Sequence, residues 1–183
     1  TIEFPDELLQ ALETGASVAV NGVCFTVTRI EERKVSFDAI AETLALSNIQ
    51  FIEAGTQVNI ERSAKSGAEV GGHILSGHIV GTSELVSIEE SSNNKRLTFK
   101  GNPDWLKFVF EKGFLAVNGC SLTVAALDRQ KHQFAINLIP ETLARTNFAL
   151  LKAGDPVNIE IESQTQVIVE TVERIMEQRF SKQ

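Results

Sequence analysis

The chain has 183 residues, of which 43% are hydrophobic and 22% are charged, so it is long enough and apolar enough to bury a globular core. Its formal net charge is −7 and its 17 Lys and Arg residues are scattered, which argues against nucleic acid as the main partner. No run approaches the roughly 18–20 apolar residues that span a membrane, and no secretory leader precedes the first predicted element. Because two cysteines also suggest a reducing compartment, we expect a cytoplasmic protein with no membrane partner.

The first predicted elements are a short helical turn followed by several short strands. The stretch PDELLQAL at 5–12 has helical spacing, and SVAVNGVCFTVTRI at 17–30 reads as strand, Asn-Gly turn, strand. KVSFDAI at 34–40 and QVNIERS at 57–63 add two more runs rich in Val, Ile and Phe, with a helical ETLA at 42–45 between them. Many short strands with regular turns predict a small Greek-key β-barrel.

The rest of the chain repeats this pattern, which predicts a duplicated domain. VNGVCFTV at 20–27 returns as VNGCSLTV at 117–124, and AGTQVNIE at 54–61 returns as AGDPVNIE at 153–160. FDAIAETLALSN at 37–48 matches FAINLIPETLARTN at 134–147, and FPDELLQAL at 4–12 resembles NPDWLKFVF at 102–110. Four blocks in the same order indicate two homologous barrels, which we place at residues 1–72 and 73–164.

The two halves differ ahead of their first helical turn. The second half has a strand-like stretch at 77–101 before Pro103, whereas the first half has only four residues before Pro5. We therefore expect this chain to be a truncated form whose first barrel lacks its opening strands. An unpaired barrel edge would follow, and we expect such a form to associate weakly or to stay monomeric.

The tail has a different periodicity. In QTQVIVETVERIMEQRF at 164–180, Ile168, Val172, Ile175 and Met176 recur at helical spacing with charged residues between them. We predict an amphipathic helix over 165–183 that needs a partner surface, most simply its own copies in an oligomer. The predicted fold class is mostly β, with two tandem homologous Greek-key β-barrels, short helices and a C-terminal α-helix.

Two of the three histidines lie at the junction between the halves, in GGHILSGHI at 71–79. Their glycine neighbours allow a close backbone approach to something flat or charged. The spacing of His73 and His78 resembles part of a metal site, but no third ligand lies at a recognisable spacing, so we predict no metal. The alternatives are two surface histidines in a glycine turn, or a pair of acid/base groups that move protons near neutral pH.

The Asn-Gly turns place similar polar side chains in both halves. With the turns aligned, Cys24 pairs with Ser121 and Thr26 with Thr123, and strand alternation puts all four on one face. One reading is small residues that fill a barrel interior, which we expect for Cys120. The other reading is a polar lining for a ligand site, present once in each half.

Four motifs together resemble the riboflavin synthase family of the alpha-subunit type, and the resemblance covers essentially the whole chain. They are NG-x-[CS]-[LF]-T-V in both halves, GGHILSGH at the junction, PETLARTN in the second half, and VNIE in both. The resemblance implies that each barrel binds one 6,7-dimethyl-8-ribityllumazine. It also implies a transferase that moves a four-carbon unit from one lumazine to the other and gives riboflavin and 5-amino-6-(D-ribitylamino)uracil.

The resemblance further implies that the full-length form is a homotrimer assembled by the C-terminal helix, with active sites between the first barrel of one subunit and the second barrel of its neighbour. No metal or organic cofactor is implied. Lumazine synthase is a further expected partner. Nucleic acid and membrane are not expected partners.

Site residues are carried over from the family motifs position by position. The implied lumazine-binding residues of the first half are Cys24, Phe25, Thr26, Asp38, Ala39, Ile40, Ala41, Glu42 and Thr43. Those of the second half are Gly77, His78, Ile79, Lys112, Ser121, Leu122, Thr123, Asn137, Leu138, Ile139, Pro140, Glu141 and Thr142. The candidates for chemistry are Ser17, Cys24, His73, His78 and Glu162, the last standing where the family usually has Asp.

Three questions remain open from the sequence. The nucleophile can be Cys24, Ser17 or an activated water. A non-catalytic lumazine- or flavin-binding relative of the antenna type is the main alternative to the enzyme, and the intact GGHILSGH favours the enzyme. An oligomeric scaffold without a ligand would leave the polar pairs in both halves unexplained.

Overall fold

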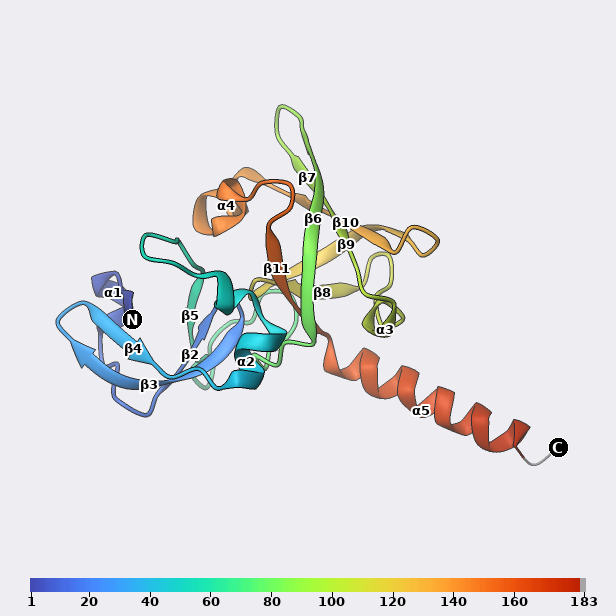
Figure 1. Cartoon of the computed structure of the whole chain (residues 1–183), viewed down its shortest axis with the longest axis horizontal. Coiled ribbons are helices and arrows are strands. Elements are labelled where there is room, and N and C mark those ends of the chain that lie inside the picture. Colours follow the sequence, from blue (N-terminus) through green and yellow to red (C-terminus); the bar gives the residue numbers. More distant parts are fainter. Residues whose placement is uncertain (182–183) are drawn as a thin grey trace.

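The computed structural model describes residues 1–181, and its first half is an open, twisted antiparallel sheet (Figure 1). The five strands run in the order β1-β4-β3-β2-β5. Their bounds are β1 (Ile2–Glu3), β2 (Ser17–Val20), β3 (Val23–Glu31), β4 (Lys34–Phe37) and β5 (Ile60–Arg62). Short helices α1 (Asp6–Leu9) and α2 (Ala41–Leu46) and a 3-10 turn (Asn48–Phe51) connect them, as the helical spacing predicts.

The second half closes into a barrel with the strand order β10-β7-β6-β11-β8-β9. Its strands are β6 (Gly81–Glu90), β7 (Lys95–Lys100), β8 (Phe114–Val117), β9 (Cys120–Asp128), β10 (Gln133–Leu138) and β11 (Pro156–Ile161). Helices α3 (Pro103–Leu106) and α4 (Pro140–Arg145) and a 3-10 turn (Asn147–Leu150) occupy the places that α1, α2 and the first 3-10 turn have in the first half.

The two sheets share one topology and differ by one strand. The order β1-β4-β3-β2-β5 corresponds to β7-β10-β9-β8-β11, and β6 closes the second sheet by pairing with both β7 and β11. Within residues 1–181 the first sheet has no counterpart of β6, so β1 and β5 are its edges. The mostly-β fold with duplicated lobes and short helices is confirmed, but closure into a barrel is seen in the second half alone.

Both Asn-Gly turns form the tight hairpins that the sequence predicts. Asn21 and Gly22 have φ of 46° and 82°, and Asn118 and Gly119 have φ of 45° and 81°, as a type I′ turn requires. The two turns lie against each other across the junction of the lobes, because a Cβ built on Gly22 would stand 2.6 Å from the backbone nitrogen of Gly119. Only glycine permits this approach.

Asparagines from both halves join the two lobes around these turns. The six are Asn21, Asn48, Asn59, Asn118, Asn147 and Asn158. Oδ1 of Asn158 accepts the backbone N–H of Asn48 at 2.6 Å, and the equivalent Oδ1 of Asn59 accepts that of Asn147 at 2.7 Å. The repeated VNG, SN/TN and VNIE motifs therefore build an interface between the halves with pseudo-two-fold symmetry.

The cores of the lobes differ in size. The closed barrel holds one continuous cluster that includes the fully buried Phe99, Phe134 and Phe148. The open sheet holds two smaller clusters, one around Phe4 and Val35 and one around the Asn-Gly hairpin. The second lobe therefore buries most of the apolar surface that drives folding.

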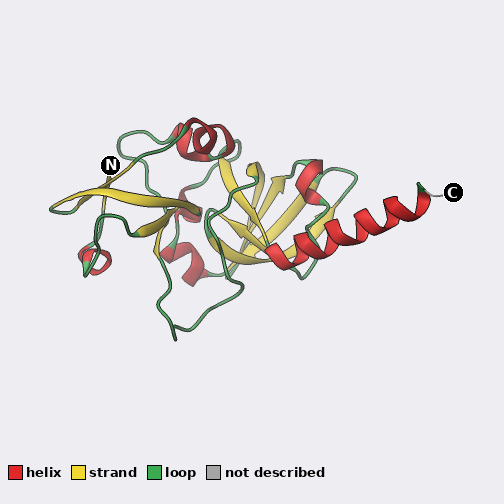
Figure 2. Ribbon diagram, turned by 90° about the horizontal axis from the view of Figure 1, so that it is seen from below, coloured by secondary structure: helices red, strands yellow, loops and turns green. Residues whose placement is uncertain are grey.

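The last helix, α5 (Ser163–Phe180), projects away from the barrel (Figures 1 and 2). A 2.6 Å ion pair between Lys107 and Glu173 ties its middle to the barrel. The predicted stripe is present and exposed, with Ile168 and Val172 among its members. Residues 182–183 of the predicted helix lie outside the described residues, and none of the described helices is long and apolar enough to cross a membrane.

Candidate functional site

The junction segment folds back over the Asn-Gly hairpins, and its glycines make this possible. The backbone N–H of Cys24 donates to the carbonyl of Gly77 at 3.3 Å, and a Cβ on Gly77, with φ of 80°, would overlap the side chain of Cys24. A Cβ on Gly72 would likewise overlap the side chain of Ser121. The predicted close approach of this segment is therefore real, and its immediate target is the hairpin strands of both halves.

A cavity of about 530 Å³ lies between the junction segment and these hairpins. Five of the predicted site residues line it, namely Ser17, Cys24, His73, Gly77 and Ser121. Glu61, Ser76 and Cys120 also line it, and the sequence reasoning had not assigned them to the site. The structure thus brings polar groups of both halves to one cavity within a single chain.

His73 is held as a neutral imidazole against the second lobe. Its ring stacks on Phe114 with centroids 5.4 Å apart, and its Nδ1 lies 2.6 Å from Oγ of Ser121. Burial lowers the pKa of His73, and the opposing charges of Glu162 and Glu160 do not reverse that effect. The Nε2 atom is buried without a hydrogen-bond partner among the described residues.

His78 lies outside the cavity wall but is connected to it through Ser76. The Nδ1 atom of His78 is 2.8 Å from Oγ of Ser76, and this hydroxyl donates to Oε1 of Glu160 at 2.8 Å. Glu160 also accepts the backbone N–H groups of Ser76 and Gly77, at 2.6 and 3.0 Å. The carboxylate of β11 therefore fixes the loop that presents His78, whose ring is exposed.

Glu162 sits at the N-terminus of α5. Its carboxylate accepts the backbone N–H groups of Gln164 at 3.2 Å and Thr165 at 2.6 Å. Burial alone would raise the pKa of Glu162, but the hydrogen bonds from Thr165 and Gln164 outweigh it and hold that pKa below its ordinary value. The longer Glu is accommodated as a helix cap, and its part in the chemistry stays a prediction.

The two cysteines have opposite environments. Cys24 is exposed and shares one face of β3 with Thr26, whereas burial raises the pKa of the Cys120 thiol to about 12. The negative charge of Glu61 adds to that effect. Cys120 packs against the barrel core, in line with the expectation that it fills space.

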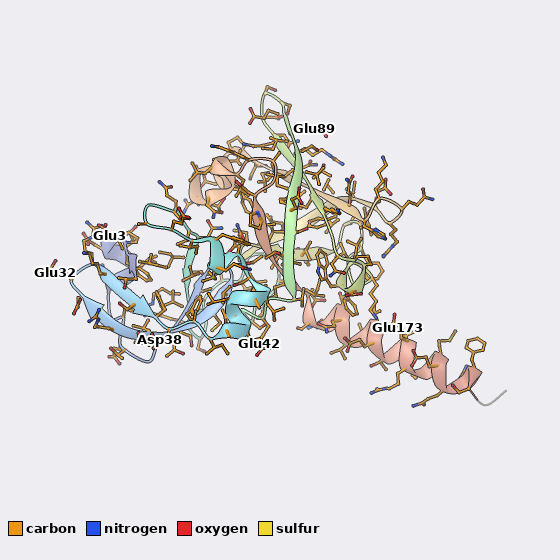
Figure 3. All side chains as sticks on the ribbon, viewed as in Figure 1. Glu3, Glu32, Asp38, Glu42, Glu89 and Glu173 are labelled. Atoms are coloured by element: carbon orange, nitrogen blue, oxygen red, sulfur yellow. The ribbon has the colours of Figure 1, made fainter. Side chains whose placement is uncertain are left out.

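The remaining predicted lumazine-binding residues lie outside the cavity, and most of them form two groups that the repeat relates to each other. One follows the end of β4 into α2, where Figure 3 labels Asp38 and Glu42. The other follows the end of β10 into α4. Ile40 and its counterpart Ile139 are 66% and 60% exposed, which is unusual for isoleucine and suits an apolar ligand-facing surface.

Some of the predicted lumazine-binding residues cannot offer a side chain to a ligand. Phe25 and Leu138 fill the cores, and Ile79 packs against the core at the first hairpin, so their contacts with a ligand would come from the backbone. Thr26, Thr123 and Lys112 are exposed. Among the other predicted residues, the exposed ones are Ala39, Ala41, Asn137, Pro140 and Glu141, and the half-buried ones are Thr43, Leu122 and Thr142.

The arrangement offers imidazoles, hydroxyls and one accessible thiol beside a space for a flat molecule. These groups can take up a proton, add to a ring carbon and donate hydrogen bonds. Within residues 1–181, no group of three His, Cys, Asp or Glu side chains lies close enough to hold a metal ion. The repeated VNIE motif could have identified Glu61 and Glu160 as candidate site residues. It could not have predicted that the surroundings of the two carboxylates differ.

Comparison with known proteins identifies the family. The model of the lumazine binding domain matches residues 1–63 and 76–162, which is both halves of the chain. Riboflavin synthase of Escherichia coli (strain K12) is 48% identical over 97% of this chain and 83% of its own length. Riboflavin synthase of Chlamydia pneumoniae is 45% identical over 90% of this chain and 80% of its own length.

Solved structures point the same way. A crystal structure of LumP complexed with 6,7-dimethyl-8-(1'-D-ribityl) lumazine superposes with a TM-score of 0.79 at 26% identity, over 87% of this chain and 85% of its own. LumP complexed with riboflavin superposes with a TM-score of 0.80 at 28% identity, over 88% and 86%. The chain belongs to the riboflavin synthase family of duplicated lumazine-binding domains.

Proposed function

We propose that this protein is an enzyme, a transferase that makes riboflavin from two molecules of 6,7-dimethyl-8-ribityllumazine. One molecule gives a four-carbon unit to the other, and 5-amino-6-(D-ribitylamino)uracil leaves as the second product. The observation that carries the proposal is the meeting of Ser17 and Cys24 from the first half with His73 and Ser121 from the second at one cavity.

The chemistry asks for groups of these types. The 7-methyl group of the lumazine is acidic because its ring delocalises the resulting anion, so a neutral imidazole is a sufficient base. Addition at the second ring needs a nucleophile, for which Cys24, Ser17 and an activated water are the candidates. Both side chains line the cavity. Holding two flat rings face to face can remove about 7–11 kcal/mol from the barrier, which makes positioning the largest contribution.

The duplication supplies the two binding units. We take residues 1–72 and 73–164 as one lumazine-binding unit each, with the two groups that follow β4 and β10 as the ring- and ribityl-binding strands. The exposed stripe on α5, including Ile168, Val172 and Met176, supports assembly into a homotrimer through the helix at 165–183. Association with lumazine synthase and a cytoplasmic location remain predictions.

Incubation with 6,7-dimethyl-8-ribityllumazine alone tests the activity. We expect the longer-wavelength absorbance of the flavin to grow without any added cofactor, with one flavin formed for every two lumazines consumed. Cys24→Ser and Ser17→Ala separate the candidate nucleophiles, because the variant that lacks the attacking atom should lose most of its turnover.

A non-catalytic lumazine- or flavin-binding protein is the second candidate, favoured by the likeness to LumP in complex with lumazine and with riboflavin. The two candidates differ in a single measurement. Tight binding of the lumazine, seen as a change in its fluorescence, without formation of flavin would decide for the binding protein.

His78→Ala offers a further test of the enzyme. The ring of His78 is exposed and makes its one hydrogen bond to an exposed serine, so its loss should lower the free energy of unfolding by less than about 1 kcal/mol. Turnover should fall by far more, about 100-fold, if the imidazole transfers a proton. Equal losses of turnover and stability would make His78 a structural residue.

A further inference from the structure

Glu160 is a buried carboxylate to which the proposed chemistry gives no direct part. It is 3% exposed, it lies on β11 of the closed barrel, and its backbone pairs with Ala116 of β8. Burying a charge is costly unless hydrogen bonds compensate for it. Here three donors do so, which are the Ser76 hydroxyl and the backbone N–H groups of Ser76 and Gly77. Both carboxylate oxygens act as acceptors, so all three hydrogen bonds are donated to the group by the loop above it.

The direction of the hydrogen bonds fixes the proton on His78. A serine hydroxyl has one proton, and Ser76 gives it to Oε1 of Glu160 at 2.8 Å. Toward Nδ1 of His78, also at 2.8 Å, the same oxygen can act only as an acceptor. Nδ1 must therefore carry a hydrogen, and in the neutral ring the lone pair available to a reactant is on Nε2.

We propose that Glu160 is a positioning residue that acts through Ser76 to hold His78 in the Nδ1–H tautomer, with Nε2 as the proton acceptor. The proposal rests on the proposed function. When His78 takes a proton at Nε2, the Nδ1–H bond to Ser76 stays intact, and returning that proton restores the neutral ring. This chain of hydrogen bonds from Glu160 through Ser76 to His78, here called the relay, therefore keeps Nδ1 of His78 protonated and hydrogen-bonded throughout the cycle.

The repeat provides a comparison within the chain. Glu61 on β5 is the counterpart of Glu160 in the VNIE motif, yet it is exposed, and within residues 1–181 its carboxylate accepts no hydrogen bond like those of Glu160. The strand thus pairs with its neighbour at this position without hydrogen bonds to the carboxylate. What distinguishes Glu160 is the loop above it, which carries Ser76 and His78.

Ser76→Ala separates the relay from the anchoring of the loop. It removes the hydroxyl that links Glu160 to His78 but leaves both backbone N–H groups bound to the carboxylate. Because Ser76 is exposed, the loss of its hydroxyl should not unfold the protein. Ser76→Thr restores a hydroxyl at the same position, and Glu89→Gln, on the hairpin far from the junction, controls for the loss of a surface charge (Figure 3).

The decisive measurement is the tautomer of His78 in the full chain, read from the ring nitrogen shifts of a ¹⁵N-histidine-labelled sample at a pH where the ring is neutral. His78→Ala identifies the signal. We expect a protonated Nδ1 and an unprotonated Nε2 in the native chain and in Ser76→Thr and Glu89→Gln. In Ser76→Ala and Glu160→Gln the Nε2–H tautomer should become the major form.

Turnover supplies the second measurement. Ser76→Ala should lower kcat at least tenfold while KM changes less than twofold, and Ser76→Thr should recover most of the loss. The double variant Ser76→Ala, Glu160→Gln should lose no more than the worse single variant, because both cut one relay. An unchanged tautomer in Ser76→Ala overturns the proposal, as does a changed tautomer with unchanged kcat. A native chain that forms no flavin would instead overturn the proposed function, since the tautomer is measured without turnover.

Discussion

The two halves contain nearly the same motifs but do not use them in the same way. Their Asn-Gly hairpins have the same backbone, with φ of 46° and 82° in one and 45° and 81° in the other. The carboxylates of VNIE, however, differ completely, since Glu160 is buried under three hydrogen bonds and Glu61 is exposed. Local sequence thus determines the hairpin, whereas the segment that covers each strand determines what its side chains can do.

The same contrast holds for the sheets. In the second half β6 pairs with β7 on one side and β11 on the other, and one core fills the closed barrel. In the first half β1 and β5 are edge strands, and the apolar residues divide into two clusters. We expect the second lobe to be the more stable one, with the first lobe held in place through the interface of asparagines and glycines.

The largest expected effect is at that interface, in Gly22→Ala. A Cβ there would stand 2.6 Å from the backbone nitrogen of Gly119, and backbone atoms of a hairpin cannot move aside easily. Together with the strain of an L side chain at φ of 82°, this should cost about 3 kcal/mol of unfolding free energy. Urea unfolding followed by circular dichroism measures it.

Gly55→Ala is the matched control for this prediction. Gly55 also has a positive φ, 93°, but a Cβ there would meet nothing within 4 Å. Its cost should be the backbone strain alone, about 1 kcal/mol. If both variants lost the same stability, the contact between the two hairpins would not be what holds the lobes together.

The next largest effect compares two equivalent asparagines. Asn158 is fully buried, and its side chain bonds to Asn48 and to the carbonyl of Asn21, so Asn158→Ala leaves several buried polar groups unpaired. We expect a loss of about 3 kcal/mol. Asn59→Ala breaks the equivalent bonds in a half-buried position, where water can replace them, and should cost about 1 kcal/mol. Equal losses in chemical denaturation would argue against the difference between the lobes.

Much of the fold could be predicted because its causes are local. Alternation of Val, Phe and Thr with the Asn-Gly turn predicts β2 and β3, and it also predicts that Cys24 and Thr26 share one face of β3, as they do. The helical stripe predicts α5. Each of these features depends on residues that are close together in the sequence, within one helical turn or within one hairpin.

The features that sequence reasoning missed depend on contacts between distant segments. The repeated asparagines looked like turn and strand residues, yet Asn48 contacts Asn158 across the two lobes. Likewise, nothing local indicates that the junction segment folds back so that Ser76 meets Glu160. The family resemblance named Ser17, Cys24 and His73 as candidates, but it implied sites between neighbouring subunits and did not predict that these residues line one cavity of a single chain. Periodicity could not predict it either, because it places residues on faces of strands but does not bring distant strands together.

The two thiols give a comparison of reactivity. Because the pKa of Cys120 is about 12, only about one part in ten thousand of that thiol is ionised near pH 8, and the thiolate is the reactive form. Cys24 is exposed. We expect a thiol reagent such as 5,5′-dithiobis(2-nitrobenzoate) to modify Cys24 at least 100-fold faster than Cys120. Cys24→Ser should therefore abolish the fast phase of the reaction. A fast phase that survives in Cys24→Ser would mean that Cys120 is not sequestered.

The smallest expected effect concerns the pH dependence contributed by Glu61. Although its side chain is exposed by area, its carboxyl lines the cavity, and desolvation there, with the negative charge of Glu160 nearby, raises the pKa of Glu61 above its ordinary value of 4.5. The folded state therefore binds this proton more tightly than the unfolded state, so stability falls as pH rises from about 4.5 through the raised pKa. Glu61→Gln should remove this fall, making the variant slightly more stable than the native chain at pH 7, by less than about 0.5 kcal/mol because solvent screens the group.

The free energies of unfolding of Glu61→Gln and of the native chain should converge near pH 4, whereas those of Glu89→Gln and the native chain should show no such convergence. If Glu61→Gln were less stable than the native chain at pH 7, Glu61 would have a favourable partner, and the contrast between the two VNIE carboxylates would have to be given up.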